Sequence, residues 1–513
     1  MDNVKILDCT LRDGGYYNNW DFSLKFANDY IKSLSTTSVD SIEIGFRKPI
    51  NTNTSSNYTI LKKIGNFLIT KEKLIDNLKI PQNKTLAVMI DLSDYADKNG
   101  LKNLKKNFRN SKSSKVKLVR IACNYNDRSK LPIVIKYLKA KNYKVAANLM
   151  KFTILTHKEI YTFFKIAQNL GADYLYLADS FGNCEPRQIN KISKSLKKKG
   201  IYSNKLGFHS HDNTGKALKN SIAAIRNGFG IIDTSLMGMG RGAGNLKLED
   251  FLRYRKKHNE IKKIKEFTDK NMSYLYKKYK WGKNKFYKYS ANNNIHPTFV
   301  QRLIEEKKFK KEITLNILKF LKTSKASNYD MDIFNDLFLE TKKVSQNFKS
   351  NTKKIAIFCD NKNIQKFNLE NIKELGFVTS SLNFTKYINN KFLDLVFQSN
   401  GYRIFTEIDK ILKIKNIKLV VPNYILLKKF VEKFGNKIIN YNIYKNKKLK
   451  IKKNYCSYEK NLVLVYALSF CISNNINEIK IFGLTKSPSN LKIIDLFRNN
   501  IKKNKIKSKI LIN

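Results

Sequence analysis

The stretch LGFHSHDNTGKALKNSIAAIRNGFGIIDTSLM (206–237) holds one complete unit of the predicted fold. Its two apolar runs, LGFH (206–209) and IIDTSLM (231–237), predict short buried strands. Between them, GKALKNSIAAIRNG (215–228) places apolar residues at helical spacing. A strand, a helix and a second strand in this order are typical of α/β folds, in which helices connect parallel strands.

The same alternation extends back to the beginning of the sequence. Six earlier apolar runs are separated by polar, helix-like segments such as SLKFANDYIKSLS; the runs are VKILD (4–8), SIEIG (41–45), TLAVMID (85–91), VKLVRIA (116–122), YKVAANL (143–149) and DYLYLA (173–178). Eight strand–helix units within about 250 residues predict a (β/α)₈ TIM barrel. Since 513 residues exceed what one hydrophobic core usually organises, we also expect a second domain.

The rest of the sequence predicts a helical extension and then an α/β domain. The extension contains one aromatic stretch, YKKYKWGKNKFYKYSANNNIHPTFVQRL, and NLVLVYALSFCISNN (461–475) predicts a buried helix. Apolar runs return at KIAIFCD (354–360), LDLVFQSN (393–400), IKLVVPN (417–423), KIINYNIY (437–444) and EIKIFGLT (478–485). We expect a catalytic barrel over 1–255, the extension over 256–349 and a Rossmann-like domain with a parallel sheet over 350–513. That last domain has neither GxGxxG nor GxxxxGK[ST], so its sequence gives no support to nucleotide binding.

The chain is strongly basic, with 99 Lys and Arg against 41 Asp and Glu and a net charge of +58. A basic patch would suit nucleic acid or an anionic membrane. These lysines, however, are spread along all the predicted helices, and no RNA-binding aromatic motif accompanies them. We therefore interpret the charge as a compositional preference for Lys, Asn and Ile, and expect a small-molecule substrate and no nucleic-acid partner. A non-enzymatic binding protein is the alternative function that this charge would suit. A homodimer is compatible with the sequence.

The N-terminal sequence MDNVKILDCTLRDG enters a predicted strand at once and lacks the basic head, apolar run and cleavage site of a signal peptide. A continuous apolar stretch of about eighteen residues, which a membrane span would need, does not occur. The six cysteines form no CxxC pair and are expected to be reduced, buried thiols. We expect a cytoplasmic protein without a membrane span or a metal–thiolate site.

Polar residues gather where the predicted barrel strands end, which is where TIM-barrel enzymes place their active sites. Those ends carry Arg12 and Asp13, Glu43, Asp91, Asn148, Asp179 and Ser180, and His209 with His211. The loop GMGRGAGN (238–245) follows the eighth strand. Its glycines, Gly242 among them, could expose backbone N–H groups to an anionic substrate or form a tight turn. We assign Asp91, Asn148, Asp179 and Gly242 as candidate substrate-binding residues.

The pair His209-x-His211 is the most specific functional signal among these residues. Alternate residues of a strand face the same side, so both imidazoles can point at one ion. Neutral imidazole is a common ligand of divalent transition metals, and a carboxylate completes a set with open positions. Asp13, from the first strand end, is the natural third ligand. With five histidines in the chain, an accidental pair is the alternative.

Arg12 has a chemical role beside such a metal. The ion can polarise a substrate carbonyl, and a fixed guanidinium can stabilise the enolate oxygen that forms when a carbon–carbon bond breaks. The alternative is a structural Arg12–Asp13 pair that ties the first strand to a neighbour. Glu43, Asp91 and Asp179 either orient Arg12 and the histidines or are satisfied residues of the barrel rim; we count Glu43 among the catalytic candidates.

Three motifs resemble the signatures of the DRE-TIM metallolyase family, which includes HMG-CoA lyase, 4-hydroxy-2-oxovalerate aldolase and the isopropylmalate and homocitrate synthases. They are LDCTLRDGG (7–15), GFHSHDNTGKALKNSIAAIRNG (207–228) and GMGRGAGNLKLED (238–250), and the similarity covers roughly residues 1–250. The resemblance implies that Asp13, His209 and His211 bind the metal and that Arg12 is the catalytic arginine. Asn245 matches the asparagine that ligates metal in the lyase and synthase branches, and Glu43 and Asp179 match polar strand-end positions.

The sequence also departs from each branch of that family. The aldolases carry a histidine shortly after RDG that takes the substrate hydroxyl proton, but here the stretch is GYYNNW and Tyr16 occupies the place, or less plausibly Tyr17. The lyases carry a cysteine in the loop after the eighth strand, which GMGRGAGN lacks, and the synthases often have Glu where this chain has Gly15. The form of the motifs is most similar to aldolase-type members.

The resemblance thus implies a divalent-metal-dependent carbon–carbon lyase or aldolase, similar to 4-hydroxy-2-oxovalerate aldolase, that acts on a 2-oxo acid through a metal-bound enolate. The expected cofactor is Mn²⁺ or Mg²⁺, before Zn²⁺ or Co²⁺. A Claisen-type acyltransferase that joins acetyl-CoA to a 2-oxo acid is the alternative, favoured by Asn245 and the missing histidine but not by Gly15. An Fe(II) oxygenase also uses two histidines and a carboxylate, usually in another order and within a jelly roll.

Overall fold

Eight parallel strands close into a barrel in the first half of the chain. In chain order they are β1 (Lys5–Asp8), β2 (Val39–Phe46), β3 (Thr85–Asp91), β4 (Val116–Cys123), β5 (Lys144–Met150), β6 (Tyr174–Asp179), β7 (Leu206–Ser210) and β8 (Ile231–Thr234). Pairing of β1 with both β2 and β8 completes the ring, so the barrel has no open edge. The predicted TIM barrel is confirmed. The predicted run IIDTSLM continues past β8 into the short 3₁₀ helix η8 (Leu236–Gly238).

The computed structural model describes residues 3–49, 64–95, 99–305, 311–323, 326–330, 348, 353–385, 387, 389–422, 437–459 and 462–513. The chain divides into two compact units, Met1–Tyr329 and Asp330–Asn513. Each unit has its own sheet and its own apolar core. Parts of the predicted helical extension (306–310, 324–325, 331–347 and 349) and the last residue of the predicted run IKLVVPN lie outside the described residues.

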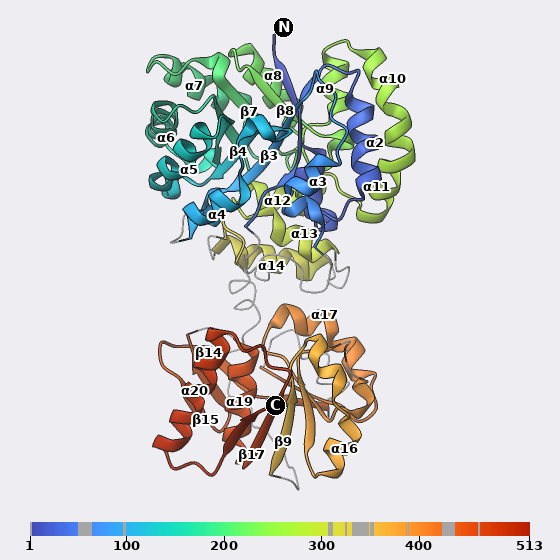
Figure 1. Ribbon diagram of the computed structural model, residues 1–513, viewed down its shortest axis with the longest axis vertical. Helices are drawn as coiled ribbons and strands as arrows, with labels where there is room; N and C mark the ends of the chain where they lie inside the picture. Colours follow the sequence, from blue (N-terminus) through green and yellow to red (C-terminus); the bar gives the residue numbers. More distant parts are fainter. Residues whose placement is uncertain are drawn as a thin grey trace. The chain divides into compact units, whose positions relative to one another are not determined.

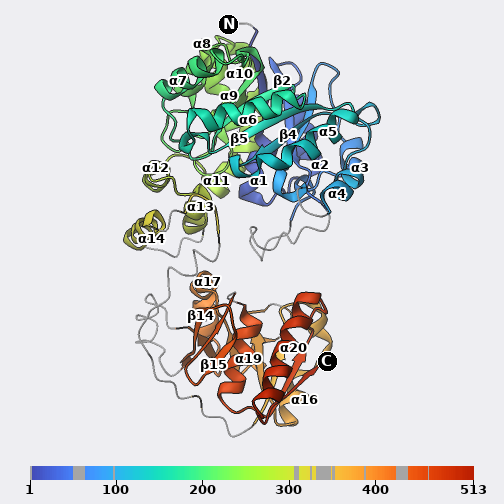
Figure 2. The ribbon, with the colours of Figure 1, turned by 90° about the vertical axis from the view of Figure 1, so that its left-hand side faces the viewer.

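Helices cover the outside of the barrel (Figures 1 and 2). They are α2 (Leu24–Leu34), α3 (Glu72–Asp76), α4 (Gly100–Asn107), α5 (Leu131–Ala140), α6 (His157–Asn169), α7 (Pro186–Lys197), α8 (Ala217–Arg226) and α9 (Leu248–Tyr254). Helix α1 (Thr10–Asn18) instead follows β1 directly at the carboxyl-terminal end of the barrel, and eight of its nine residues are buried. Helix α2 shows the common pattern, because Ala27, Tyr30, Ile31 and Leu34 form one buried face. Helix α6 begins at a capping box in which the Thr156 and Glu159 side chains accept each other's backbone N–H groups.

The extension continues the first unit with α10 (His258–Phe267), the π-helix η9 (Thr268–Met272), α11 (Ser273–Tyr279), α12 (Lys285–Asn292), α13 (Pro297–Glu305) and α14 (Lys311–Thr323). Its aromatic stretch packs onto the carboxyl-terminal side of the barrel. Trp281 is buried and donates its Nε1 hydrogen to the carbonyl of Met237, 2.9 Å away. Tyr17 donates to the carbonyl of Gly242 at 2.5 Å and lies 3.4 Å from the Tyr287 hydroxyl. The extension is therefore part of the wall around the barrel mouth.

The second unit is an α/β domain, as predicted. Its parallel sheet has the order β13-β12-β11-β10-β9-β17-β18, with β9 (Lys354–Phe358), β10 (Val378–Leu382), β11 (Leu395–Phe397), β12 (Lys418–Val421), β13 (Ile438–Asn440), β17 (Glu478–Phe482) and β18 (Lys509–Ile512). The predicted run KIINYNIY divides between this sheet and a small second one, β14-β16-β15, made of β14 (Asn442–Lys445), β15 (Lys450–Lys452) and β16 (Tyr455–Tyr458).

Helices α16 (Leu369–Glu374), α17 (Gly401–Leu412), α19 (Val463–Ser473) and α20 (Pro488–Lys503) accompany these strands. The predicted buried helix corresponds to α19, in which the nine residues from Leu464 to Ile472 are all buried. Of the helices that the structure describes, none combines the length and apolarity needed to cross a bilayer.

Candidate active site

Three side chains converge at the carboxyl-terminal end of the barrel. Asp13 lies in α1, directly after β1, while His209 and His211 lie on β7 and at its end. Asp13 Oδ2 is 3.5 Å from His211 Nε2 and 3.9 Å from His209 Nε2. All three side chains are buried, and the donor atoms that they offer lie within 4.8 Å of one another. The fold therefore brings an imidazole pair and a carboxylate together in the arrangement of a metal site, as the sequence predicts.

Several donor atoms of this cluster lack a hydrogen-bond partner, and this shows whether a cation fits. Among the described residues, Asp13 Oδ2 and His211 Nε2 are buried atoms without a hydrogen-bond partner. Asn245 Oδ1 is a third such atom, and Asn245 pairs with His211 through an isolated β-bridge. A buried polar atom without a partner is costly, whereas carboxylate, imidazole and amide donors together suit a divalent cation. The residues present thus fit a metal ion.

The electrostatics of the cluster favour the ligand forms of its groups. Burial alone would raise the pKa of the Asp13 carboxyl, but Arg12, the two histidines and Arg241 outweigh burial and hold that pKa well below its ordinary value. Burial also holds the pKa of His211 well below its usual range, against the opposing effect of Asp13. At neutral pH the carboxylate is charged and the His211 imidazole is neutral, as metal binding requires.

Both imidazoles are oriented through their second nitrogen. His209 Nδ1 lies 3.0 Å from Asp233 Oδ2, and His211 Nδ1 lies 3.1 Å from the backbone carbonyl of Asp179. A proton on Nδ1 in each ring would leave Nε2, which faces Asp13, with its lone pair free. Partners of this kind fix the ring orientation of metal-binding histidines.

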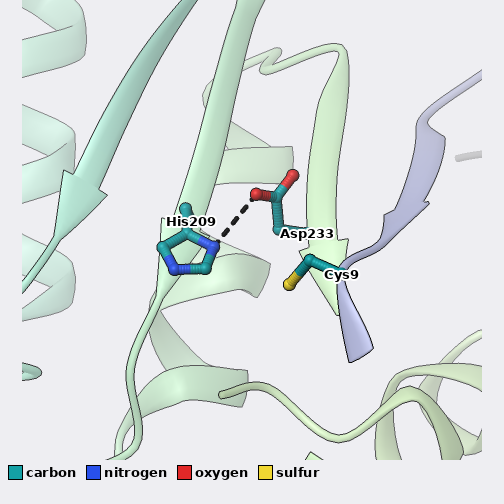
Figure 3. Close-up of side chains that lie close together, drawn as sticks. All are labelled: Cys9, His209 and Asp233. Atoms are coloured by element: carbon teal, nitrogen blue, oxygen red, sulfur yellow. Dashed lines mark hydrogen bonds and ion pairs between the residues drawn. The ribbon is translucent and has the colours of Figure 1, made fainter. Parts of the chain in front are cut away.

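Cys9, His209 and Asp233 form a second cluster of potential ligand atoms (Figure 3). In it, only the His209–Asp233 contact is a hydrogen bond between the residues drawn. The Cys9 thiol donates instead to the Thr234 carbonyl at 3.3 Å, and burial raises its pKa well above its ordinary value. Because this thiol stays protonated, the cluster supports His209 and does not offer a thiolate to a metal.

Arg12 is held beside the cluster by two ion pairs. Its Nε contacts Glu43 Oε2 at 2.6 Å and its Nη1 contacts Asp13 Oδ1 at 2.5 Å. Glu43 Oε2 also pairs with Arg120 at 2.9 Å, and Arg120 pairs in turn with Asp233. A continuous chain of buried charges thus runs from Asp13 to the carboxylate that orients His209.

Sequence reasoning missed Arg120 and Asp233. Both side chains are fully buried inside the barrel. Each interrupts an apolar run, VKLVRIA or IIDTSLM. A charged residue inside a barrel strand is rarely buried without a partner, and that signal could have revealed them.

The other predicted residues lie around or beneath two connected cavities. The inner cavity is bordered by Arg12, Asp13, His209 and His211, and the outer cavity, of about 290 Å³, lies against α13 and the loops after β3, β4 and β5. The two share Tyr16, Asp91, Ala122, Met150 and Arg241 in their walls. A volume of this order suits a small organic acid.

Asp91 and Asn148 face this space. Asp91 is paired with Lys48 at 2.8 Å and borders both cavities. Asn148 borders the inner one, and its Oδ1 is buried without a hydrogen-bond partner among the described residues. Tyr16 borders both cavities, and burial raises the pKa of its phenol above the ordinary value of 10.0.

Asp179 and Gly242 both take part in hydrogen bonds within the loops around the site. The Asp179 carboxylate accepts the N–H groups of Asn183 and Cys184 at 3.1 and 3.0 Å, and burial raises its pKa to about 7. Gly242 has a positive φ of 71°, and its N–H is directed to Gln301 Oε1 at 3.4 Å. These two residues shape the loops around the site.

The HMGL-like family model matches residues 3–269 of the chain. The 4-hydroxy-2-oxovalerate aldolase of Geobacillus genomosp. 3 is 26% identical over 246 residues, which are 48% of this chain and 68% of the relative. The enzyme of that name from Carboxydothermus hydrogenoformans is 26% identical over 250 residues, with the same coverage of 48% and 68%. The crystal structure of the N-terminal domain of a candidate aldolase from Bacteroides vulgatus has a TM-score of 0.50 and 30% identity, and covers 61% of this chain and 99% of that domain.

Proposed function

Because this chain belongs to the HMGL-like family, with the match spanning its barrel, we propose that it is a divalent-metal-dependent carbon–carbon lyase of the 4-hydroxy-2-oxovalerate aldolase type. The resemblance to the DRE-TIM metallolyases is thereby confirmed. The observation that carries the proposal is the meeting of Asp13, His209 and His211 at one buried point, with Arg12 fixed beside them. The substrate would be a 4-hydroxy-2-oxo acid, which is cleaved to pyruvate or a related 2-oxo acid and an aldehyde.

Asp13, His209 and His211 would hold the cation, with Asn245 as a further oxygen donor. A bound divalent cation would act as a Lewis acid toward the 2-oxo acid. The carboxylate and amide oxygens suit Mn²⁺ or Mg²⁺, whereas the two imidazoles also suit Zn²⁺ or Co²⁺. From the family resemblance we propose Mn²⁺ or Mg²⁺ as the cofactor ahead of Zn²⁺ or Co²⁺.

Arg12 would stabilise the negative charge that develops on the enolate oxygen. Its ion pairs use Nε and Nη1, and its side chain borders the inner cavity. Glu43 accepts from both Arg12 and Arg120, so it holds the guanidinium in place before substrate arrives. Such preorganised donors commonly supply about 2.7–4 kcal/mol of transition-state stabilisation.

Tyr16, or a water molecule in the same cavity, would move the proton of the substrate hydroxyl. The raised pKa keeps the phenol protonated at neutral pH. In the direction of bond formation it can therefore donate its proton to the new alkoxide oxygen. In cleavage a protonated phenol cannot accept the hydroxyl proton, so there the water molecule would take it. Asp91 and Asn148 face the space in which the substrate would lie and would position it.

The experiment is a pyruvate-release assay with 4-hydroxy-2-oxovalerate and Mn²⁺, coupled to lactate dehydrogenase, together with a measurement of bound metal. We expect about one divalent ion per chain in the wild type, and loss of both metal and activity in a His209→Ala, His211→Ala double variant. The matched control replaces two exposed histidines, His157 and His258, by alanine and should retain both. An active protein that binds no metal would contradict the proposal. Release of free CoA from acetyl-CoA and 2-oxo acids, without pyruvate formation, would establish the acyltransferase alternative.

The small-molecule activity also bears on localisation and partners. A reaction of small metabolites is compatible with a cytoplasmic enzyme. We propose a cytoplasmic localisation and no nucleic-acid partner. Homodimer formation is likewise a proposal.

A further inference from the structure

Two basic side chains meet at the outer cavity although they come from distant parts of the barrel. Lys151 follows β5 directly, and Arg241 lies in the loop after β8. Arg241 also borders the inner cavity, so its guanidinium stands between the metal cluster and the outer space. The ion pairs and hydrogen bonds described above for Arg12 and the two histidines involve neither residue.

Arg241 is buried but incompletely satisfied. Only 7% of the residue is exposed, and its Nε is a buried atom without a hydrogen-bond partner among the described residues. Its Nη1 lies 3.4 Å from His296 Nε2, and its guanidinium carbon lies 5.2 Å from the centre of the Tyr16 ring. These contacts orient the guanidinium but do not neutralise it.

Lys151 reaches the same cavity from a strained backbone. Its φ and ψ of 55° and 33° are left-handed, which is unfavourable for a residue with a side chain. Its N–H donates to Ser180 Oγ at 3.0 Å, and its ammonium group contacts the Asn328 side-chain oxygen. Backbone strain of this kind often accompanies a functional site.

Two other cations around these cavities, Lys48 and Arg12, have acids as ion-pair partners. Lys48 pairs with Asp91 and Asp94, each at 2.8 Å, and Arg12 with Asp13 and Glu43. Among the described residues, no Asp or Glu forms an ion pair with Arg241 or Lys151. Burial and the charge of Arg241 together lower the pKa of Lys151 to about 8. Arg241 is buried and Lys151 is partly buried. The two cations repel each other, and the nearby Asp127 offsets this only in part, so an anion bound between them would stabilise both.

We propose that Arg241 and Lys151 bind an oxyanion at the far end of the substrate, so that this enzyme acts on a dianionic 4-hydroxy-2-oxo acid. This inference rests on the proposed function. The carboxylate of the 2-oxo acid lies toward the metal cluster and Arg12, and the second carboxylate or phosphate lies toward Lys151. The bidentate N–H groups of arginine and the point charge of lysine are suited to both oxyanions.

The reaction itself then fixes which product carries the second charge. Cleavage breaks the bond between C3 and C4, the C4 hydroxyl becomes the aldehyde, and C3 of the 2-oxo acid gains a proton. The group bound by Arg241 and Lys151 is attached beyond C4, so it leaves on the aldehyde. The product is therefore an aldehyde that bears a carboxylate or phosphate, in place of a neutral aldehyde.

A binding experiment tests the subsite without requiring catalysis. The metal-loaded full chain is titrated by calorimetry with succinate and with inorganic phosphate, with pyruvate present to occupy the 2-oxo acid position. We expect one of the two anions to bind. Lys151→Gln and Arg241→Gln should each weaken this binding at least tenfold, since a hydrogen bond to a charged group is usually worth that much. Arg241→Lys, which keeps the charge, should restore part of it.

The matched controls are Lys158→Gln on α6 and Arg226→Gln on α8, both exposed residues, and they should bind as the wild type does. Condensation of pyruvate with propanal, succinic semialdehyde or glyceraldehyde 3-phosphate then distinguishes carboxylate from phosphate. The two glutamine variants should lower kcat/KM for the preferred anionic aldehyde at least tenfold more than they lower that for propanal, which has no anionic group.

The outcomes separate the two proposals. If the wild type binds neither anion, or if the glutamine variants bind as tightly as the controls, the subsite is wrong even where the enzyme cleaves 4-hydroxy-2-oxo acids. If the variants lose anion binding but the wild type condenses pyruvate with none of the aldehydes, the subsite stands and the lyase function fails.

Discussion

Arg120 connects the two halves of the candidate site. It contributes one ion pair to Glu43, which holds Arg12, and another to Asp233, which orients His209. Its guanidinium carbon also lies 4.4 Å from the centre of the Tyr176 ring. Because this cation lies between two buried carboxylates, the position of both Arg12 and His209 depends on it.

Replacing Arg120 by methionine should destabilise the protein strongly. The change leaves Glu43 and Asp233 buried without their cation, and breaking a buried ion pair in this way typically costs about 3–5 kcal/mol. Urea unfolding monitored by circular dichroism measures the effect. The exposed Arg226→Met variant is the control, and its free energy of unfolding should change by less than about 0.5 kcal/mol. Equal free energies of unfolding for the two variants would show that the ion pairs of Arg120 with Glu43 and Asp233 do not stabilise the fold.

At the scale of elements, the loop after β8 depends on the first turn of α9. Both carboxylate oxygens of Glu249 accept the backbone N–H of Met237, at 2.9 and 3.0 Å. Met237 itself has a positive φ of 50°. This clamp shapes the start of the segment that carries Arg241 and Asn245, so one acid in α9 helps to place two residues of the site.

Burial raises the pKa of Glu249 from 4.5 to about 7. In the folded state the group therefore keeps its proton up to about pH 7, while the unfolded chain releases it near pH 4.5. Its contribution to stability is fully present below pH 4.5 and is lost as the pH rises toward 7. Glu249→Gln cannot ionise, so its free energy of unfolding should fall less than that of the wild type between pH 5 and 7, by about 1–3 kcal/mol. Denaturant titrations at several pH values test this, with Asp250→Asn as the control on the same helix. Parallel pH profiles for wild type and Glu249→Gln would contradict it.

At the scale of the whole molecule, the chain consists of two units with separate apolar cores. The candidate metal ligands all belong to the first unit. Ligand binding stabilises only the folded unit that holds the ligand, by about 2.7 kcal/mol at a hundredfold excess over the dissociation constant.

We therefore expect two thermal transitions in calorimetry of the full chain. Chelation of divalent metal should lower the Tm of one transition by several degrees and leave the other unchanged. In the His209→Ala, His211→Ala variant the chelator should have no effect on either. A single transition that shifts as a whole on chelation would show instead that the two units unfold as one.

The sequence by itself determined the barrel and which residues meet at the centre of the candidate site. Alternating apolar runs and helical segments are local patterns in the sequence. Eight successive strand–helix units of this kind predict a TIM barrel. Once parallel strands are assigned, their carboxyl ends must share a rim, so Asp13, His209 and His211 could be placed together before any distance was known. The second domain followed from the same kind of local pattern, although KIINYNIY, expected as one run, serves two sheets.

Only the tertiary structure decided which charges meet. The links from Glu43 through Arg120 to Asp233 depend on how the barrel closes and on its strand register. Lys151 and Arg241 meet because the loops after β5 and β8 face the same cavity, and His296 joins them through the path of the extension over the barrel mouth. Neither has a periodic signal in the sequence, because such contacts join residues that are far apart along the chain and follow from the packing of the whole unit.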